Sequence, residues 1–328
     1  MAGKNPLIAA ALVVLAACSE NPISPDPITT APPIPVGGNP ISGVTFWVDP
    51  NSSAKQQADA WRASRPADAA QMDKIARGSQ AQWMGGWNGD VLAAVNSAVT
   101  TASAAGAVPV LVAYNIPQRD CGGLSAGGTS VDGYKSWIAA FADGLAGRRA
   151  VVILEPDALT QMDCLSAGDQ TTRLGLIQYA IAVLKAQANV AVYLDGGHSA
   201  WKSPSDQASR LTRANVAATD GFALNVSNFQ FTSNSIAYGK AISDLIGGKH
   251  FVIDTSRNGL GPTADNQWCN PVGRAIGPRT TTVTDDARVD AYLWIKAPGE
   301  SDGSCNGAPA AGAWWADYAL GLAQRSAL

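Results

Sequence analysis

Short apolar runs alternate with longer helix-like stretches along most of the chain. The apolar runs are rich in Val, Ile and Leu and have the length of strands. They occur at 43–50, 82–87, 108–114, 150–156, 190–195, 221–226, 250–254 and 291–296, and 82–87 is the weakest. The helical segments between them include 54–77, 90–105, 131–145 and 171–188. This order predicts an α/β fold with a parallel sheet and outer helices, either a closed (β/α) barrel or an open doubly wound sheet.

One apolar run, VVILEPDAL at 151–159, ends in two carboxylates that flank a proline. Pro156 lacks the N–H that a sheet ladder needs, so the strand should end there with Glu155 extended. Asp157 then follows the C-terminal end of a core strand, where α/β folds place their chemistry. The alternative is that Asp157 only caps the N-terminus of the next helical segment.

Acidic residues follow other predicted strands in the same way. They are Asp120, Asp195, Asp254, Glu300 and Asp302. The C-terminal ends of parallel strands meet at one face of a barrel. The pattern therefore predicts a carboxylate-lined cleft, in which some of the acids belong to structural ion pairs.

The first 42 residues differ from the rest of the chain. Residues 1–18 combine a positive charge, an apolar stretch and small residues before Cys18, which predicts a secretory signal peptide. Its last residues, LAAC, are similar to a bacterial lipobox, which would make Cys18 the lipid-bearing N-terminus. The alternative is ordinary cleavage nearby, with Cys18 left as an odd thiol.

Residues 19–42 hold seven prolines and no periodic apolar pattern, so we expect an extended linker. The folded domain is then expected at 43–328. Together the two N-terminal segments predict an exported protein. It would be either secreted or held at the cell surface, with Cys18 as its only attachment to the membrane.

Composition argues against several classes of function. The net charge is −3, charged residues make up only 15%, and no basic patch is visible, so we expect no nucleic-acid partner. The chain lacks GxGxxG, P-loop and CxxC motifs and has only two histidines, His198 and His250. We therefore expect neither a nucleotide nor a metal cofactor.

Tryptophan and cysteine content give two further indications. The ten tryptophans outnumber the six phenylalanines and seven tyrosines, and flat aromatic faces suit stacking on sugar rings. Four cysteines lie in the expected domain, and export makes disulfides their expected state, with three pairings possible. They are Cys121, Cys164, Cys269 and Cys305.

Two motifs resemble the signature stretches of glycoside hydrolase family 6, the inverting β-1,4-glucanases. They are VAYNIPQRDCGGLSAGG at 112–128 and VILEPDAL at 152–159. Further blocks that resemble this family, in its order, are YLDGGHSAW at 193–201, WCNPVGR at 268–274 and WIKAPGESDG at 294–303. The resemblance covers roughly 43–325 and implies a distorted (β/α) barrel of about seven parallel strands.

The resemblance also implies roles for the acidic residues. Asp157 matches the general acid, Asp120 the carboxylate that supports it, and Asp302 the candidate base. Asp195 matches a further acid of the site, and Tyr114 the aromatic residue beneath the sugar at the cleavage point, although Tyr114 could also be a core tyrosine. In an inverting glycosidase the acid and base carboxyls lie about 6.5–9.5 Å apart, which leaves room for water.

A second set of residues matches positions that contact sugar. They are Trp83, Trp201, Trp268, His198, Lys296, Glu300 and Asn225. Trp83 and Trp268 could instead be core residues, His198 a structural hydrogen-bonding group, and Lys296 with Glu300 an ion pair. The arginines near the acids are expected to balance their charge, and these are Arg119, Arg257 and Arg274.

The resemblance implies the disulfides Cys121–Cys164 and Cys269–Cys305. It leaves the serine near the catalytic water without a clear counterpart, since Ser125 is the nearest serine and Ala126 lies beside it.

The leading hypothesis is a monomeric, lipid-tethered endo-β-1,4-glucanase that acts on a β-1,4-glucan. The exo-acting members of the family enclose their sites with long loops, and this domain has few residues to spare. The alternatives are an exo-acting cellobiohydrolase and a non-catalytic envelope protein that binds polysaccharide. A metal-dependent deacetylase would need clustered histidines.

Overall fold

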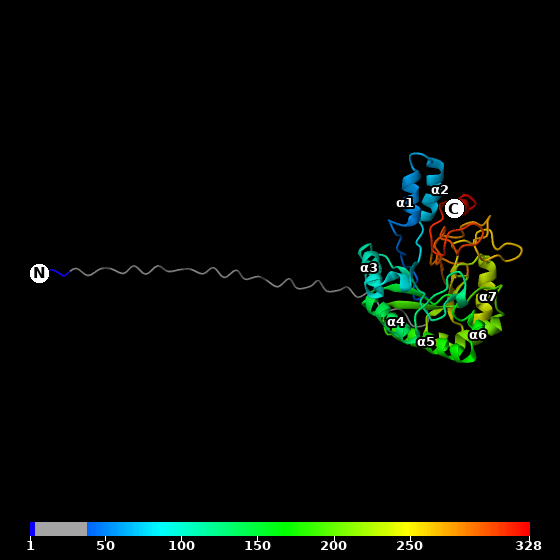
Figure 1. Ribbon diagram of the computed structural model, residues 1–328, viewed down its shortest axis with the longest axis horizontal. Coiled ribbons are helices and arrows are strands. Elements are labelled where there is room, and N and C mark those ends of the chain that lie inside the picture. The colour runs from blue at the N-terminus through cyan, green and yellow to red at the C-terminus, as the bar shows by residue number, and fades with distance from the viewer. Residues whose placement is uncertain (4–37) are drawn as a thin grey trace. The chain divides into compact units, whose positions relative to one another are not determined.

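The computed structural model describes residues 1–3 and 38–328 (Figure 1). The predicted lipobox at Cys18 and most of the predicted signal peptide and linker therefore lie outside the described residues. In the part that is described, no helix is both long and apolar enough to cross a membrane.

The described residues form one parallel sheet of seven strands in the order of the sequence. The strands are β1 (Gln82–Met84), β2 (Val110–Ala113), β3 (Ala150–Leu154), β4 (Val190–Asp195), β5 (Gly221–Leu224), β6 (His250–Asp254) and β7 (Val289–Leu293). This confirms the predicted parallel fold. The predicted strand at 43–50 is wrong, because the segment makes only an isolated bridge between Phe46 and Val108.

Side chains that alternate along each strand fill two separate cores. In β2, Val110 and Val112 belong to the inner cluster, whereas Leu111 and Ala113 pack with the outer helices. Both faces are therefore buried, which explains why the strands read as continuous apolar runs instead of alternating ones. Small residues such as Ala191 and Ala223 keep the inner cluster narrow enough to curl the sheet.

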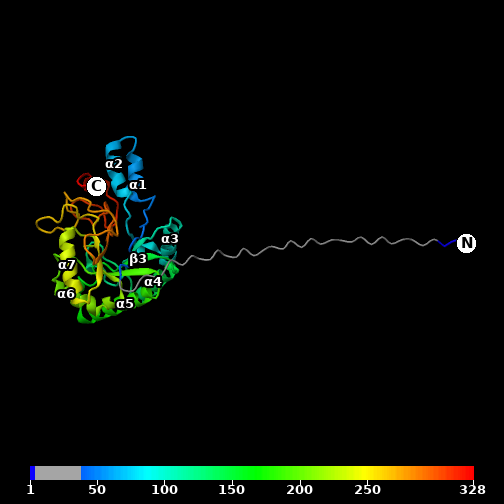
Figure 2. The ribbon, with the colours of Figure 1, turned by 180° about the vertical axis from the view of Figure 1, so that it is seen from behind.

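The described chain contains eight α-helices (Figures 1 and 2). They are α1 (Ser53–Trp61), α2 (Pro66–Ala76), α3 (Val91–Ala104), α4 (Val131–Leu145), α5 (Ala167–Lys185), α6 (Pro204–Arg213), α7 (Thr232–Leu245) and α8 (Ala316–Gln324). The predicted single helix at 54–77 is two helices, because Pro66 cannot continue α1 and instead starts α2.

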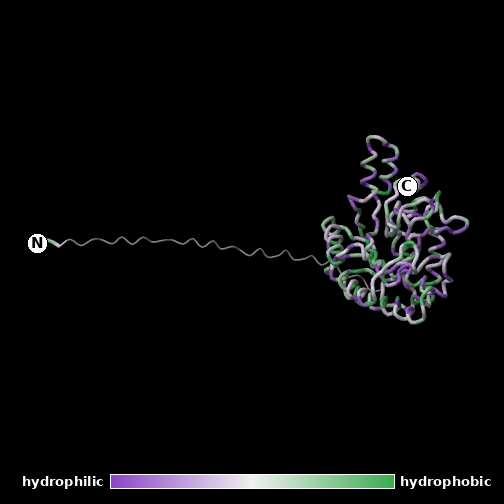
Figure 3. The backbone as a smooth tube through the Cα atoms, viewed as in Figure 1, coloured by the Kyte–Doolittle hydropathy of each residue, from purple (hydrophilic) through white to green (hydrophobic). Residues whose placement is uncertain are grey.

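The α1–α2 hairpin lies beside the C-terminal helix and not against the main outer core (Figure 1). Met72 and Ile75 of α2 pack with Tyr318 and Leu322 of α8 in a third cluster that also contains Trp294. Hydrophilic colouring follows much of the hairpin in Figure 3, as expected for an element with only one buried edge.

The sheet curls until its two edge strands approach each other. The Ala81 N–H donates to the Trp294 carbonyl at 2.9 Å, and the Trp83 indole N–H donates to the Ile295 carbonyl at 2.8 Å. The donors of these two bonds lie at or beside β1, and the acceptors follow β7. The two bonds take the place of the hydrogen-bond ladder that would join two neighbouring strands. The result is the distorted barrel that the family resemblance implies, closed at its seam by loops.

The chain enters the domain at the end of the barrel where the strands begin. Ile41 is 2% exposed and packs in the inner cluster, and the Asn39 side-chain amide donates to the Asp290 carbonyl near the start of β7. Packed structure therefore begins at about Asn39, four residues before the predicted start of the domain at 43.

Buried carboxylates join neighbouring strands at the opposite end of the barrel. Glu155 accepts hydrogen bonds from the backbone N–H groups of Asn115 and Ile116 after β2, at 3.0–3.1 Å. Burial raises the pKa of Glu155 to about 7, although these two donors act in the opposite direction. The prediction that Glu155 is extended is wrong: its φ is 47°, and this turn sends the side chain back to the neighbouring strand end.

Asp254 makes a larger set of the same contacts at the end of β6. Its carboxylate accepts from the backbone N–H groups of Ser227 after β5, Ser256 after β6, and Ile295 and Lys296 after β7, at 2.9–3.3 Å. One side chain thus fixes three strand ends. Asp254 is completely buried and does not line the cleft, so its role is structural.

Replacing Asp254 should therefore destabilise the barrel. Asp254→Leu leaves buried backbone N–H groups without acceptors, and we expect the free energy of unfolding in urea to fall by about 3 kcal/mol or more. Asp254→Asn keeps one acceptor oxygen and should lose less. The exposed Asp244→Asn is the matched control, and an equal loss in all three variants would contradict the role given to Asp254.

Candidate active site

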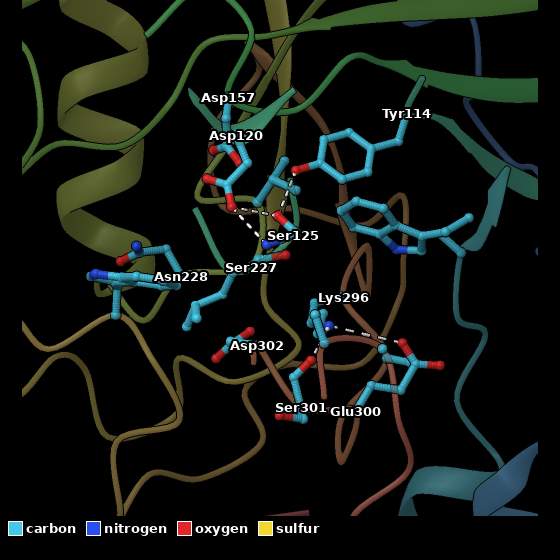
Figure 4. Close-up of a pocket in the computed structure, with 18 of the residues that line it drawn as sticks. Tyr114, Asp120, Ser125, Asp157, Ser227, Asn228, Lys296, Glu300, Ser301 and Asp302 are labelled. Atoms are coloured by element: carbon cyan, nitrogen blue, oxygen red, sulfur yellow. Dashed lines mark hydrogen bonds and ion pairs between the residues drawn. The ribbon is translucent and has the colours of Figure 1, made fainter. Parts of the chain in front are cut away.

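A cleft of about 1060 Å³ lies over the C-terminal ends of the strands. Six carboxylates line it. One is Asp49, which precedes α1, and the other five come from the loops after β2, β3 and β7 and from the end of β4. These five are Asp120, Asp157, Asp195, Glu300 and Asp302, and Figure 4 labels all of them except Asp195. The predicted gathering of acids at one end of the barrel is thus present, and Asp254 is the predicted member that is buried outside the cleft.

Asp157 follows the Pro156 turn and adopts a φ of 69°, which directs the residue away from the path of β3. Burial raises the pKa of Asp157 well above its usual value, and the charges of Asp195, Asp120 and Asp302 raise it further. In the described structure, the Asp157 carboxylate accepts no hydrogen bond from the backbone that follows, as an N-cap would. The geometry therefore favours the interpretation of Asp157 as a protonated acid.

Asp195 supports the same protonation state from the neighbouring strand. Its Oδ1 accepts from the backbone N–H groups of Asp157 and Gly197, both at 3.1 Å. Burial raises the pKa of Asp195 to about 7, and the two N–H donors lower it. Because these donors stabilise the ionised form of Asp195, a proton shared by the two carboxyls belongs on Asp157.

Asp120 is held from both sides as a hydrogen-bond acceptor. Its Oδ2 accepts from the Ser125 backbone N–H and hydroxyl, both at 2.8 Å, and its Oδ1 accepts from the Gln161 amide at 3.1 Å. The Ser125 hydroxyl also lies 3.0 Å from the Tyr114 hydroxyl. Ser125 therefore joins the Asp120 carboxylate to Tyr114, whereas the Ala126 carbonyl accepts from Arg119.

Tyr114 lies at the end of β2 with its ring held on two sides. It meets the Trp83 ring edge-on at a centroid distance of 5.1 Å, and the Arg119 guanidinium lies 4.5 Å from its centroid. Burial raises the pKa of Tyr114, and the negative charge of Asp157 raises it further, so the phenol stays protonated at neutral pH. Tyr114 is thus both packed and part of the cleft wall.

One oxygen of the Asp302 carboxyl group is already occupied by protein donors. Its Oδ2 accepts from the Arg257 guanidinium at 2.8 Å and from the Asn270 backbone N–H at 3.0 Å. In the described structure no protein donor contacts Oδ1, which leaves this oxygen for a water molecule. The prediction that Arg257 balances an acid therefore agrees with the geometry.

The other two arginines play different parts. Arg274 donates to the carbonyls of Leu260, Gly261 and Pro262, and Arg119 donates to those of Tyr114, Ser125 and Ala126. Neither donates a hydrogen bond to a carboxylate in the described structure, and both hold loops. Arg119 also balances charge, because its positive charge opposes the rise that burial causes in the pKa of Glu155.

Lys296 and Glu300 are an ion pair and line the cleft at the same time (Figure 4). The Lys296 Nζ lies 3.9 Å from Glu300 Oε2, donates to the Ser301 carbonyl at 3.1 Å and lies 6.0 Å from the Trp83 ring. Burial lowers the pKa of Lys296 and raises that of Glu300, although their mutual attraction opposes both shifts.

Aromatic residues line the cleft on both sides of the acids. The His198 and Trp201 rings pack at 5.3 Å after β4, and burial lowers the pKa of His198 to about 4, so its imidazole is neutral. Trp268 is 52% exposed, and Trp83 is partly buried. Trp87 and Trp314 also line the cleft and were not predicted; their exposure could not be inferred from their residue type.

Asn225 is the predicted sugar-contacting residue that the structure places elsewhere. It is buried outside the cleft, where its amide donates to the Asp254 carbonyl at 2.8 Å and its Oδ1 accepts from the Gln230 N–H at 3.0 Å. Ser227 and Asn228 line the cleft instead. The role of Asn225 is to hold the loop that presents them.

The loops that carry Asp120 and Asp157 are fixed to each other. The disulfide Cys121–Cys164 joins them, and a second disulfide, Cys269–Cys305, lies beside Asp302, as the family resemblance implies. Arg173 of α5 is buried and donates to the carbonyls of Pro117, Gln118 and Ala158, which spans both loops. Its position on a helix gave no sign of this role in the sequence.

Comparison with known proteins agrees with this architecture. The model of the family described as glycosyl hydrolases family 6 matches residues 41–326. Endoglucanase A of Cellulomonas fimi is 47% identical over 290 residues, which covers 88% of this chain and 62% of that protein. A protein of Aspergillus niger named a probable 1,4-beta-D-glucan cellobiohydrolase C is 30% identical over 367 residues, covering 87% and 77% of the two chains.

Among solved structures, the endoglucanase Cel6 of Mycobacterium tuberculosis superposes with a TM-score of 0.83 at 45% identity. The match covers 88% of this chain and 99% of that one, whose structure contains a thio-linked methyl-cellobiosyl cellobioside. A curled parallel barrel with an acid-lined cleft at its strand ends is typical of an enzyme. The chain belongs to glycosyl hydrolases family 6.

Proposed function

We propose that this protein hydrolyses internal β-1,4-glucosidic bonds of cellulose or a related β-glucan, with inversion of the anomeric carbon. The observation that carries the proposal is the gathering of Asp157, Asp302 and Asp120 in one cleft, where Arg257 holds Asp302, Ser125 holds Asp120, and burial and the neighbouring carboxylates raise the pKa of Asp157. The proteins of Cellulomonas fimi and Mycobacterium tuberculosis that this chain is similar to are both named endoglucanases, which supports the choice of substrate.

In the proposed reaction, protonated Asp157 donates its proton to the glycosidic oxygen as the bond breaks. Asp120, held in place by Ser125 and Gln161, stabilises the positive charge that develops on the sugar. Asp302 orients a water molecule through its free Oδ1 and accepts its proton, directly or through a second water. Attack from the face opposite the leaving group inverts the anomeric carbon.

An open cleft with internal attack is favoured over attack from a chain end. The alignment with the cellobiohydrolase runs to 367 positions, more than the 328 residues of this chain, so that relative contains insertions. The alignment with endoglucanase A needs only 290 positions for 88% of this chain, so few insertions separate the two. This chain therefore lacks the extra residues with which long loops could roof the cleft.

The alternatives that the sequence left open are less well supported. A non-catalytic polysaccharide-binding protein would not need a half-buried Asp157 whose pKa is raised by burial and by three other carboxylates. We also propose that the protein acts as a monomer.

We further propose that the protein is exported and anchored at the cell surface by a lipid on Cys18. The LAAC sequence at the end of the apolar N-terminal stretch supports this proposal, and the proline-rich stretch at 19–42 would separate the enzyme from the membrane.

A soluble glucan tests the proposed function directly. Internal attack should lower the viscosity of carboxymethylcellulose well before many reducing ends appear. The first product resolved by NMR should be the α-anomer, because a single displacement inverts a β-linkage. An initial β-anomer would contradict the inverting mechanism, and reducing ends that rise in step with the fall in viscosity would favour the exo-acting alternative.

Replacing Asp157 separates an acid from a structural residue. Asp157→Asn removes the proton but keeps the shape, so cellulose hydrolysis should slow by about 10²–10⁴-fold. A dinitrophenyl cellobioside, whose leaving group needs no proton, should slow far less. The wild-type rate should fall as the pH rises through the raised pKa of Asp157, because only the protonated form is active, and the variant should lose this limb. The same slowing on both substrates would rule out the acid role.

Cys18→Ser tests the anchor. If Cys18 carries a lipid, the wild-type protein should partition with membranes and the variant should remain in the aqueous phase. Catalysis by the released variant should be unchanged, because the substitution lies outside the catalytic domain. Wild-type protein found entirely in the aqueous phase of a detergent extraction would show that the chain is secreted without a lipid.

A further inference from the structure

Packing within the protein does not account for the exposed position of the Trp87 side chain. It lies in the short 3-10 helix η1 (Gly86–Asn88) that follows β1, its side chain is 56% exposed, and it lines the cleft. Burying a tryptophan stabilises a protein substantially, so an exposed one in a cleft suggests a ligand that covers it.

The exposed ring is held in a fixed position. A Cβ at residue 85 would lie only 2.4 Å from the Trp87 ring, so glycine is needed there for the ring to rest on the backbone. The Asn88 side chain closes the turn by accepting from the Gly85 N–H at 2.7 Å. A ring that is already ordered loses little conformational entropy when a ligand stacks on it.

Arg119 lies near both the Trp87 ring and the ring of Tyr114, which is the residue expected at the cleavage point. Arg119 is 8% exposed, and its guanidinium lies 5.2 Å from the Trp87 centroid and 4.5 Å from the Tyr114 centroid. Three backbone carbonyls accept its hydrogen bonds, which fix its plane. One cation thus links the ring beneath the reacting sugar to the exposed ring after β1.

We propose that Trp87 is a stacking platform for a further sugar residue of the substrate, on the side of the cleavage point where Trp83 also lies. The inference rests on the proposed function, since it takes the ligand to be a β-linked glucan chain. The C–H groups on the flat face of a glucose ring suit the negative face of an indole. The platform would extend the cleft along the chain and strengthen the binding of longer substrates.

Binding of oligosaccharides of different lengths tests the platform. Isothermal titration with cellotriose and cellohexaose would use the full chain in the Asp157→Asn background, so that the ligand is not cleaved. Trp87→Ala should raise the Kd for cellohexaose by about 3- to 10-fold, the worth of one aromatic stack, and the Kd for cellotriose by less than about twofold. Trp87→Phe should restore most of the affinity, because it keeps a flat ring.

Tyr179→Ala is the matched control, since Tyr179 is an exposed aromatic residue on α5 that does not line the cleft. Thermal unfolding of each variant shows whether Trp87 is merely structural. Equal losses for both ligands, no loss, or a wild-type chain that binds neither oligosaccharide would each overturn the proposal. Binding that depends on Trp87 in a chain that hydrolyses no glucan would refute the proposed function but support the platform.

Discussion

The structure depends on buried carboxylates that accept backbone N–H groups across the ends of neighbouring strands. A parallel strand that ends inside a curled sheet leaves polar groups that water cannot reach, and each such group costs free energy unless it finds a partner. Glu155 supplies the partner between β2 and β3, Asp195 between β3 and β4, and Asp254 between β5, β6 and β7. The strand ends become a rigid rim, and the loops that leave this rim start from fixed positions.

Catalytic geometry follows from this rim. Glu155 and Asp157 are separated only by Pro156, yet the first is committed to backbone donors while the second has no such donor in the described structure and faces other acids. The same chemical group is therefore structural in one position, whereas in the other it is the proposed proton donor. Asp195 combines the structural role and the role in the cleft, because the backbone N–H that donates to its carboxylate is that of Asp157.

Sequence reasoning reached the strands, the helices and the acids of the cleft because these follow from local pattern or from recognisable motifs. Two of its errors involve features that depend on distant partners. The run at 43–50 is apolar enough for a strand, but its residues pack against the floor of the barrel and only Phe46 makes a bridge. Asn225 carries a polar side chain at a strand end, yet Asp254 and Gln230 engage it inside the fold.

The point at which the chain enters the barrel has a mechanical consequence. Asn39 and Ile41 lie where the strands begin, whereas the cleft lies where they end, so the described chain enters the barrel on the side away from the cleft. A support attached to the protein on that side would not cover the cleft. Long, stiff polymers could then settle into the groove sideways without first being threaded past the surface that holds the protein.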